Sequence, residues 1–326
     1  IESVYREALS LSPQDNGVRN VLANLLVKKA RSIRNHPHTP EECRKGIENL
    51  REAIELMADG YPAYEELSEY YLAQNDMNTL LNEWEDAVQR HPDRMLAQFN
   101  LGLAHERRGE LDAALDAYRK ALALKPEAEG TQEALERTLK KRAEECRQEG
   151  NNAASAKLLE EAVALRPMDD HAKIALAQTL GDLGDFARAA TQLRELIALQ
   201  PGTYAPYELL SDLYLRDNDL AGLETEWRAQ TAAHPDRMLA QFCLGLALER
   251  QGNIEGAIAS YRNALQLEPD KAGTKDALAR TLIKHAKTFQ KEDSEKALAE
   301  LQEAYQLAPG NPHVVTELGM ALAAQH

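Results

Sequence analysis

Histidine and carboxylate side chains at helical spacing are the residues of this 326-residue chain that could bind a catalytic metal ion. The stretch HERRG begins at His105, and a zinc site of the HExxH type needs a second histidine four positions later on the same helix face. Gly109 occupies that position, so the motif is incomplete. Neither G-x-S-x-G nor G-x-x-x-x-G-K-S/T occurs, and the sequence therefore shows no common hydrolase elbow or phosphate loop.

Two further segments resemble incomplete metal sites. Residues 217–222, DNDLAG, resemble the start of a calcium loop, but Ala221 replaces an oxygen ligand and Arg228 stands where the bidentate glutamate belongs. A second segment gathers mixed ligand types, namely His36, His38, Glu41, Glu42 and Cys43. An H-x-H pair in an irregular segment is more often solvated surface than a metal site. We therefore predict no metal, no cofactor and no catalytic residue.

Composition narrows the class of partner. The chain carries 38 Lys and Arg against 53 Asp and Glu, which gives a formal net charge of -15 and a pI near 5.2. This field repels phosphate backbones and argues against nucleic acid as a partner. No apolar run approaches the roughly 18 residues of a membrane span. Three scattered cysteines are too few for a disulfide framework, and their odd number slightly favours a reducing compartment, the cytoplasm, over the periplasm.

One nonamer occurs twice. HPDRMLAQF occupies residues 91–99 and again 234–242, an offset of 143. At the same offset other structural residues match, namely Tyr64 with Tyr207, Trp84 with Trp227, Gly102 with Gly245, and Tyr118 with Tyr261. Matching aromatic residues and glycines at one offset indicate duplication of a structural unit. We expect both tryptophans to be core residues that fill space between helical layers.

A shorter period lies inside each copy. Residues 95–128 contain two amphipathic helical stretches on either side of Gly109 and end near a helix-stopping Pro126. This pattern predicts a helix-turn-helix hairpin. The nonamer would join two such hairpins, with Asp93 or Asp236 capping the helix that follows.

The hairpin resembles the tetratricopeptide repeat, a helical pair of about 34 residues. The residues that carry the resemblance are Leu101, Gly102, Gly109, Ala114, Tyr118, Ala121 and Pro126, and again Leu244, Gly245, Gly252, Ala257, Tyr261, Ala264 and Pro269. The resemblance implies an all-α fold: a right-handed α-α superhelix, or solenoid, of about eight helical hairpins plus a half-repeat at each end, formed by residues 1–326 as a single domain.

The offset implies a duplicated unit of four repeats, about 61–203 and 204–326, the second incomplete. Four repeats leave seven additional residues, about 129–135, which we expect to lengthen one first helix, with Thr131 and Thr274 as N-caps of the two lengthened helices. A separate insertion at about 31–43 contains His, Pro and Thr and is predicted to be a loop. Both ends fall inside a repeat, so we expect the parent protein to continue, or the uncapped ends to self-associate.

The resemblance also implies a binding surface, because the first helix of each hairpin lines the concave groove of such a superhelix. Phe99 and Leu103 lie one helical turn apart on a first helix, as do Phe242 and Leu246. Exposed apolar patches of this kind mark partner surfaces. The alternative is that both phenylalanines pack between neighbouring helices.

Charged residues are segregated near these apolar pairs. The acidic candidates are Glu65, Glu69, Glu208 and Asp212. The basic candidates are Arg137, Lys140, Lys141 and Arg147. Such runs are usually solvated, but their recurrence predicts electrostatic selection of a peptide or partner helix.

These observations predict a non-catalytic scaffold or adaptor that binds a protein or peptide in the groove. The alternative is a substrate-recruiting or regulatory arm of a larger enzyme, such as a glycosyltransferase or another transferase. The fold serves many unrelated partners and does not choose between the two.

Overall fold

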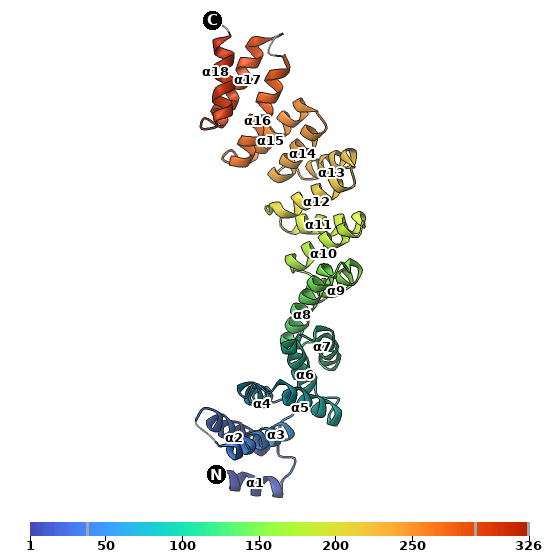
Figure 1. The fold of residues 1–326 in the computed structure, drawn as a ribbon, viewed down its shortest axis with the longest axis vertical. Helices are drawn as coiled ribbons and strands as arrows, with labels where there is room; N and C mark the ends of the chain where they lie inside the picture. The colour runs from blue at the N-terminus through green and yellow to red at the C-terminus, as the bar shows by residue number, and fades with distance from the viewer. Residues whose placement is uncertain (37–38, 290–291, 325–326) are drawn as a thin grey trace. The chain divides into compact units, whose positions relative to one another are not determined.

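The chain folds as a succession of helical hairpins. The computed structural model describes residues 1–36, 39–289 and 292–324, and these ranges contain 18 α-helices and no β-strand (Figure 1). The described helices form eight hairpins, from α2/α3 to α16/α17, with α1 and α18 as single helices at the ends. The predicted all-α fold of about eight hairpins with a terminal half-repeat at each end is confirmed.

The helices belong to two compact units. Unit 1, Ile1–Met168, contains α1 (Glu2–Leu11), α2 (Asn16–Arg34), α3 (Pro40–Leu56), α4 (Tyr61–Ala73), α5 (Met77–Arg90), α6 (Met95–Arg108), α7 (Leu111–Leu124), α8 (Glu129–Gln148) and α9 (Asn152–Leu165). Unit 2, Asp169–His326, contains α10 (Asp170–Asp182), α11 (Phe186–Leu199), α12 (Tyr204–Arg216), α13 (Leu220–Ala233), α14 (Met238–Arg250), α15 (Ile254–Leu267), α16 (Ala272–Phe289), α17 (Ser294–Leu307) and α18 (Pro312–Ala323). The division at residue 168 differs from the start of the sequence duplication at residues 61 and 204.

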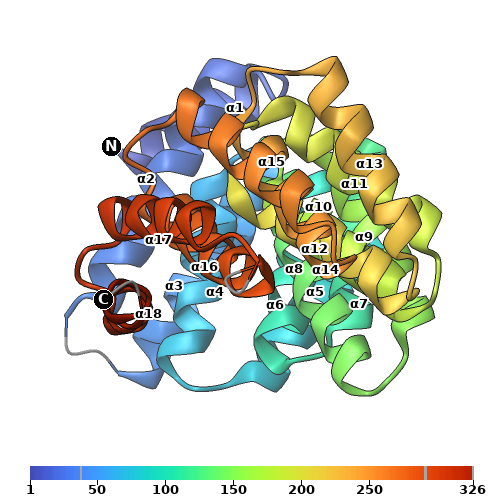
Figure 2. The same cartoon turned by 90° about the horizontal axis from the view of Figure 1, so that it is seen from above.

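Within each unit, neighbouring helices pack side by side. Figure 2 shows α16 and α17 as one such pair, with α18 beside them. The core between helices is formed by alanine, leucine and aromatic side chains, and both Trp84 and Trp227 are fully buried. Each tryptophan stacks on a tyrosine of the preceding helix with 5.5 Å between ring centroids, Trp84 on Tyr64 and Trp227 on Tyr207. The prediction that the tryptophans are core residues is confirmed.

A glycine in the first helix sets how closely the two helices of a hairpin approach. Tyr118 of α7 lies flat against Gly102 of α6, where an added Cβ would be 2.5 Å from Cε1 of the ring. Tyr261 of α15 lies at the same distance from the position of a Cβ on Gly245 of α14. Both rings are fully buried, so neither can move aside at low cost. The tyrosine and glycine positions of the repeat therefore depend on each other.

The predicted N-caps of α6 and α14 are wrong. Arg94 and Arg237 are the N-cap residues, and no side chain caps either helix, so Asp93 and Asp236 do not have that role. Arg94 instead reaches back to α3, where its Nη2 donates a hydrogen bond to Oε2 of Glu55 at 2.8 Å. In unit 1 the nonamer thus supplies a basic side chain that joins the α6/α7 hairpin to the α2/α3 hairpin.

The seven additional residues do lengthen the first helix of their hairpin. Helix α8 has 20 residues and α16 has 18, whereas α6 has 14. The predicted caps at Thr131 and Thr274 are wrong, because both helices begin two residues earlier and both threonines are buried. The Thr131 hydroxyl lies 3.8 Å from Sδ of Met95 on α6.

The segment predicted as an inserted loop, about 31–43, is helical at both ends. Helix α2 continues to Arg34 and α3 begins at Pro40, while residues 37–38 lie outside the described part of the chain. The irregular segment is therefore shorter than predicted, and much of the insertion extends helices instead.

Local sequence explains why helices α2 and α3 extend into this segment. Thr39 and Glu42 form a reciprocal capping box at the start of α3, and Pro40 occupies the first helical position. At the other end, α2 has 19 residues where α10 has 13. The additional turns bring Nε of Arg34 to 2.6 Å from Oε1 of the buried Glu66 on α4.

A repeated polar clamp joins three successive helices. Tyr71 of α4 donates a hydrogen bond to the buried carboxylate of Glu83 on α5 at 2.8 Å, and Nε of Arg51 on α3 donates to the same group at 2.9 Å. The same three residue types recur 143 positions later as Arg194, Tyr214 and Glu226. These side chains satisfy a carboxylate that burial would otherwise destabilise.

We predict that Gly102→Ala lowers the free energy of unfolding by about 1–3 kcal/mol, because the new methyl group overlaps the Tyr118 ring. Gly130→Ala is the matched control: it lies in helix α8 with no atom within 4 Å of the added Cβ and should leave stability unchanged or raise it slightly. Urea unfolding followed by circular dichroism measures both. Equal effects of the two substitutions would show that the Gly102–Tyr118 contact does not limit packing.

We predict that Glu226→Gln destabilises unit 2 by about 1–3 kcal/mol at neutral pH. Burial opposes ionisation of Glu226, but hydrogen bonds from Arg194, Gln230 and Tyr214 outweigh it and hold its pKa below the usual 4.5. A carboxylate whose pKa is lowered by folding stabilises the protein above its unfolded pKa and loses this effect as pH falls through the folded pKa. The difference from wild type should therefore shrink below pH 4.5.

Glu224→Gln on the same helix serves as the control for this prediction. Within the described part of the chain Glu224 pairs with Arg228 alone, one turn along α13, so its loss should cost less than about 0.5 kcal/mol. Thermal melting across the pH range measures both variants. A Glu226→Gln effect that is small, or that does not change with pH, would contradict the role of the clamp.

Candidate binding site

The two predicted phenylalanines are half-buried between helices. The Phe242 ring of α14 lies 6.2 Å from the Tyr204 ring of α12 and 5.7 Å from the Tyr261 ring of α15, measured between centroids. Phe99 of α6 lies 5.8 Å from Tyr118. Both phenylalanines therefore pack against neighbouring helices while part of each ring stays exposed, and their role in binding remains a prediction.

A small cavity between α12 and α14 brings three of the predicted residues together. Its volume is about 70 Å³, and Glu208, Asp212 and Leu246 lie on its wall. Two residues that the sequence reasoning missed complete it, Tyr204 at the start of α12 and Arg250 at the end of α14. Both follow from helical spacing, since Tyr204 precedes Glu208 by four residues and Arg250 follows Leu246 by four.

Charges at this cavity have no partner within the described part of the chain. Glu208, Asp212 and Arg250 are exposed and form no hydrogen bond or ion pair with its residues. Burial raises the pKa of Tyr204, the carboxylates of Glu208 and Asp212 raise it further, and Arg250 opposes the shift. The three ionised groups therefore lie close enough to act on one phenol, yet none is neutralised by direct contact.

Unit 1 has the corresponding side chains between α4 and α6. Glu65 is exposed and Leu103 is half-buried. Burial raises the pKa of Tyr61, Glu65 adds to the rise, and Arg107 opposes it, so these three side chains are also neighbours. Glu69 lies 4.0 Å from Nη1 of Arg34 on the extended α2.

The basic candidates on α8 lie elsewhere in unit 1 and are largely paired. Nη2 of Arg137 is 3.0 Å from Glu106 of α6, Lys140 pairs with Glu136, and Arg147 pairs with Glu144 one turn before it. Lys141 is exposed. Burial would raise the pKa of Glu106, but hydrogen bonds from Arg137 and Tyr118 lower it, and the charge of Lys141 adds to this lowering. Three of the four basic candidates therefore already have a carboxylate partner within unit 1.

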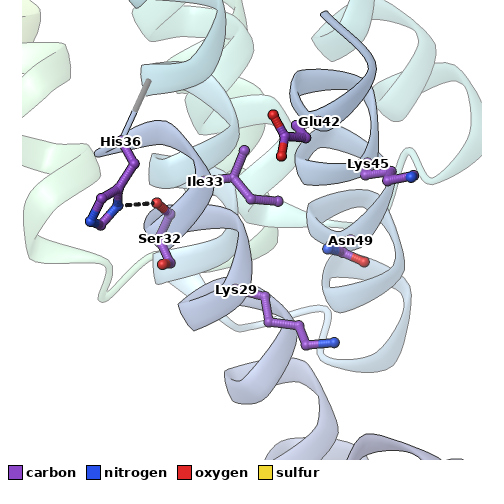
Figure 3. Close-up of a pocket in the computed structure, with 7 residues that line it drawn as sticks. All are labelled: Lys29, Ser32, Ile33, His36, Glu42, Lys45 and Asn49. Atoms are coloured by element: carbon purple, nitrogen blue, oxygen red, sulfur yellow. Dashed lines mark hydrogen bonds between the residues drawn. The ribbon is translucent and has the colours of Figure 1, made fainter. Parts of the chain in front are cut away.

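A larger hollow of about 670 Å³ lies between α2 and α3. Figure 3 shows its seven lining side chains, with His36 turned back so that its Nδ1 lies 2.8 Å from the carbonyl oxygen of Ser32. Lys29 pairs with Glu2 and Lys45 pairs with Glu41. Among its described lining residues Ile33 is the one apolar side chain, and the others are polar or charged.

Within the described ranges, no group of three or more His, Cys, Asp or Glu side chains lies close enough together to hold a metal ion. His38 of the sequence cluster lies outside these ranges. Among the described helices none is long and apolar enough to cross a bilayer.

Exposed apolar side chains are found on the two terminal helices. They are Val4 and Leu11 of α1, and Val315, Met320 and Leu322 of α18. Self-association through these helices remains a prediction.

Comparison with known families supports the resemblance seen in the sequence. A family model described as tetratricopeptide repeat matches residues 65–129 and 174–222, and a second model of the same description matches residues 239–271. The matched segments lie within the hairpins described above, including both glycine–tyrosine contacts. These segments of the chain are tetratricopeptide repeats. Repeats of this kind form scaffolds for protein–protein interaction and are typically non-catalytic.

Individual relatives of this chain are distant. Protein O-mannosyl-transferase TMTC1 of Homo sapiens is 27% identical over 181 residues, which are 54% of this chain and 20% of that protein. The chain thus spans about a fifth of the length of this curated relative.

Two solved structures illustrate the range of similar folds. A chain of Naa15/Naa10 bound to HypK-THB has a TM-score of 0.48 and 14% identity, covering 90% of this chain and 43% of that one. TTC0263, a thermophilic tetratricopeptide repeat protein of Thermus thermophilus, has a TM-score of 0.32 and 24% identity, covering 58% of this chain and 99% of that one.

We predict that the floor of the α12/α14 cavity is closed to thiol reagents. Cys243 forms this floor, and burial raises the pKa of its thiol to about 12. Cys43 of α3 is half-buried and should be alkylated first when native protein is treated with iodoacetamide, whereas Cys243 should react only after unfolding. Peptide mass spectrometry measures both sites. Alkylation of Cys243 at the rate of Cys43 would mean that the cavity opens to its floor.

Proposed function

We propose that this chain is a non-catalytic scaffold that binds a peptide segment or partner helix in the groove lined by its first helices. The α12/α14 cavity carries the proposal. Leu246 and the 40%-exposed ring of Tyr204 provide apolar surface there, beside charged groups that no other described side chain neutralises. Peptide sites commonly combine an apolar anchor with a few polar groups that fix orientation.

The other predicted residues would contribute unequally to binding. Phe242 supports the Tyr204 ring from α14, and Phe99, Leu103 and Glu65 would provide similar contacts in unit 1. Arg137, Lys140 and Arg147 have a smaller part, because each already pairs with a carboxylate of its own chain. A paired surface charge adds little to affinity for a new partner.

We predict that Tyr204→Ala weakens binding of a selected peptide about tenfold, or about 1.4 kcal/mol. The probe is the dominant twelve-residue peptide obtained by selecting a random library on the immobilised full chain, and affinity is measured by fluorescence anisotropy. Aromatic side chains at the centre of a site contribute much of its binding energy.

Tyr305→Ala is the matched control, because Tyr305 is equally exposed at 42% but lies on α17, a second helix away from the cavity. It should leave affinity unchanged, and both variants should keep the helical circular dichroism of wild type. Failure to select any peptide, or equal affinity for wild type and Tyr204→Ala, would contradict the proposed function.

One observation favours a second function, that of a recruiting or regulatory arm in a larger enzyme. The matched relative is named as an O-mannosyl-transferase, and the match covers only a fifth of it. The flanking reading frame in the gene tests this proposal. A contiguous transferase domain would support it, whereas stop codons on both sides of this segment would contradict it.

A further inference from the structure

We propose that each unit carries one copy of the same cation-accepting pocket, and that the partner presents a lysine or arginine side chain to each. The inference rests on the proposed function and specifies the chemistry of its ligand. A cation is the expected ligand because two carboxylates and one guanidinium leave each pocket with a net negative charge.

The two pockets correspond residue by residue at the offset of 143. In unit 2 the α12/α14 cavity is lined by Tyr204, Glu208, Asp212, Leu246 and Arg250. The residues of α4 and α6 at the same offset in unit 1 are Tyr61, Glu65, Glu69, Leu103 and Arg107. Four of the five pairs are identical, and the fifth exchanges one carboxylate for another. In both units the tyrosine pKa responds to the glutamate four residues later and to the arginine of the neighbouring first helix, after burial as the main cause.

Other exposed positions of the duplicated unit do not keep the same charge. On the outer helices α5 and α13, Glu85 corresponds to Arg228 and Arg90 corresponds to Ala233, all of them exposed. On α5 and α13 these exposed charges have therefore changed or disappeared, while the site residues on the first helices keep every charge. The second helices α7 and α15 do retain an exposed arginine, Arg119 and Arg262, but each pairs with a glutamate of its own unit. Packing does not explain the retention, because exposed carboxylates such as Glu208 stabilise no described contact.

The geometry suits a long basic side chain. Tyr204, Glu208 and Asp212 are each one turn apart on α12 and line one wall of the cavity. A lysine or arginine stem can pack its methylene groups on the tyrosine ring while the charged head lies between the carboxylates. Arg250 on the opposite helix is then available to a carbonyl or carboxylate group of the partner, which fixes the direction of the bound segment.

The two pockets should differ in strength. In unit 1 the guanidinium of Arg34 lies 4.0 Å from Glu69 and offsets part of its charge. In unit 2 the nearby Arg216 lines a cavity with Asp212 but pairs with Asp182 instead, at 2.8 Å. The buried position behind the pocket also differs, with Asn100 in unit 1 and Cys243 in unit 2. We expect the pocket of unit 2 to bind a cation more tightly.

Calorimetric titration of the full chain tests the inference. The probe is the library-selected peptide, trimmed to its shortest binding segment with one basic residue. We expect two sites for each chain and affinity that falls as salt concentration rises. Replacing the basic residue of the probe by glutamine should weaken binding at least tenfold at both sites.

Neutral variants assign the sites. Glu208→Gln with Asp212→Asn should abolish the tighter site, and Glu65→Gln with Glu69→Gln the weaker one. Asp276→Asn with Glu295→Gln is the matched control: it removes two exposed carboxylates from α16 and α17 of unit 2, so the net charge is the same, and should preserve both sites.

Each other outcome overturns the inference. The inference would be wrong if titration showed a single site, if the selected peptide had no basic residue, or if the neutral variants left affinity unchanged. In each of these cases the proposed function would still stand, provided that Tyr204→Ala weakened binding. If the library yields no peptide, both proposals fail.

Discussion

The close approach of the two helices within a hairpin is the constraint on which the structure depends. Gly102 against Tyr118, and Gly245 against Tyr261, leave no room for even a methyl group. A buried tyrosine then fills the space that the missing side chain leaves. A single hairpin cannot bury its remaining apolar surface, so each hairpin must stack on the next within its unit. The repeat is thus a consequence of packing.

Helix packing also separates charged side chains that stabilise the fold from those that could bind a partner. Glu83 and Glu226 are buried and held by an arginine and a tyrosine from preceding helices. Such groups stabilise the stacking of hairpins and are not free to bind a partner. The carboxylates of α12 differ because they project from a first helix onto the cavity wall and meet no cation in the described part of the chain. Function is therefore expected where a charge serves no packing purpose.

The sequence predicted the fold well because its signals are local and repeated. The glycine, tyrosine and alanine positions of one hairpin recur at a fixed spacing, which identifies the helices and their pairing. Helix ends were harder to predict: Asp93 and Thr131 looked like caps, but Arg94 and Ala128 stand at the N-cap positions. Burial of Thr131 against the preceding first helix is a tertiary contact, and no short-range pattern reveals it.

The candidate site was predicted in part. The α12/α14 cavity brings together three residues that the sequence marked, Glu208, Asp212 and Leu246, whereas Tyr204 and Arg250 were missed although both follow the same helical spacing. Ion pairing of Arg137 with Glu106, 31 residues away, likewise depends on how hairpins stack. Spacing within a helix places residues on one face, whereas the identity of their neighbours across helices requires the fold.

Hydrogen–deuterium exchange of the full chain, with and without the selected peptide, tests the central claim most directly. The account predicts slower amide exchange on peptide binding in α12 and α14, and in α4 and α6, with no change in α5 and α13. Protection confined to the second helices α5 and α13 would contradict it, because the ligand would then bind the surface that the duplication has not preserved.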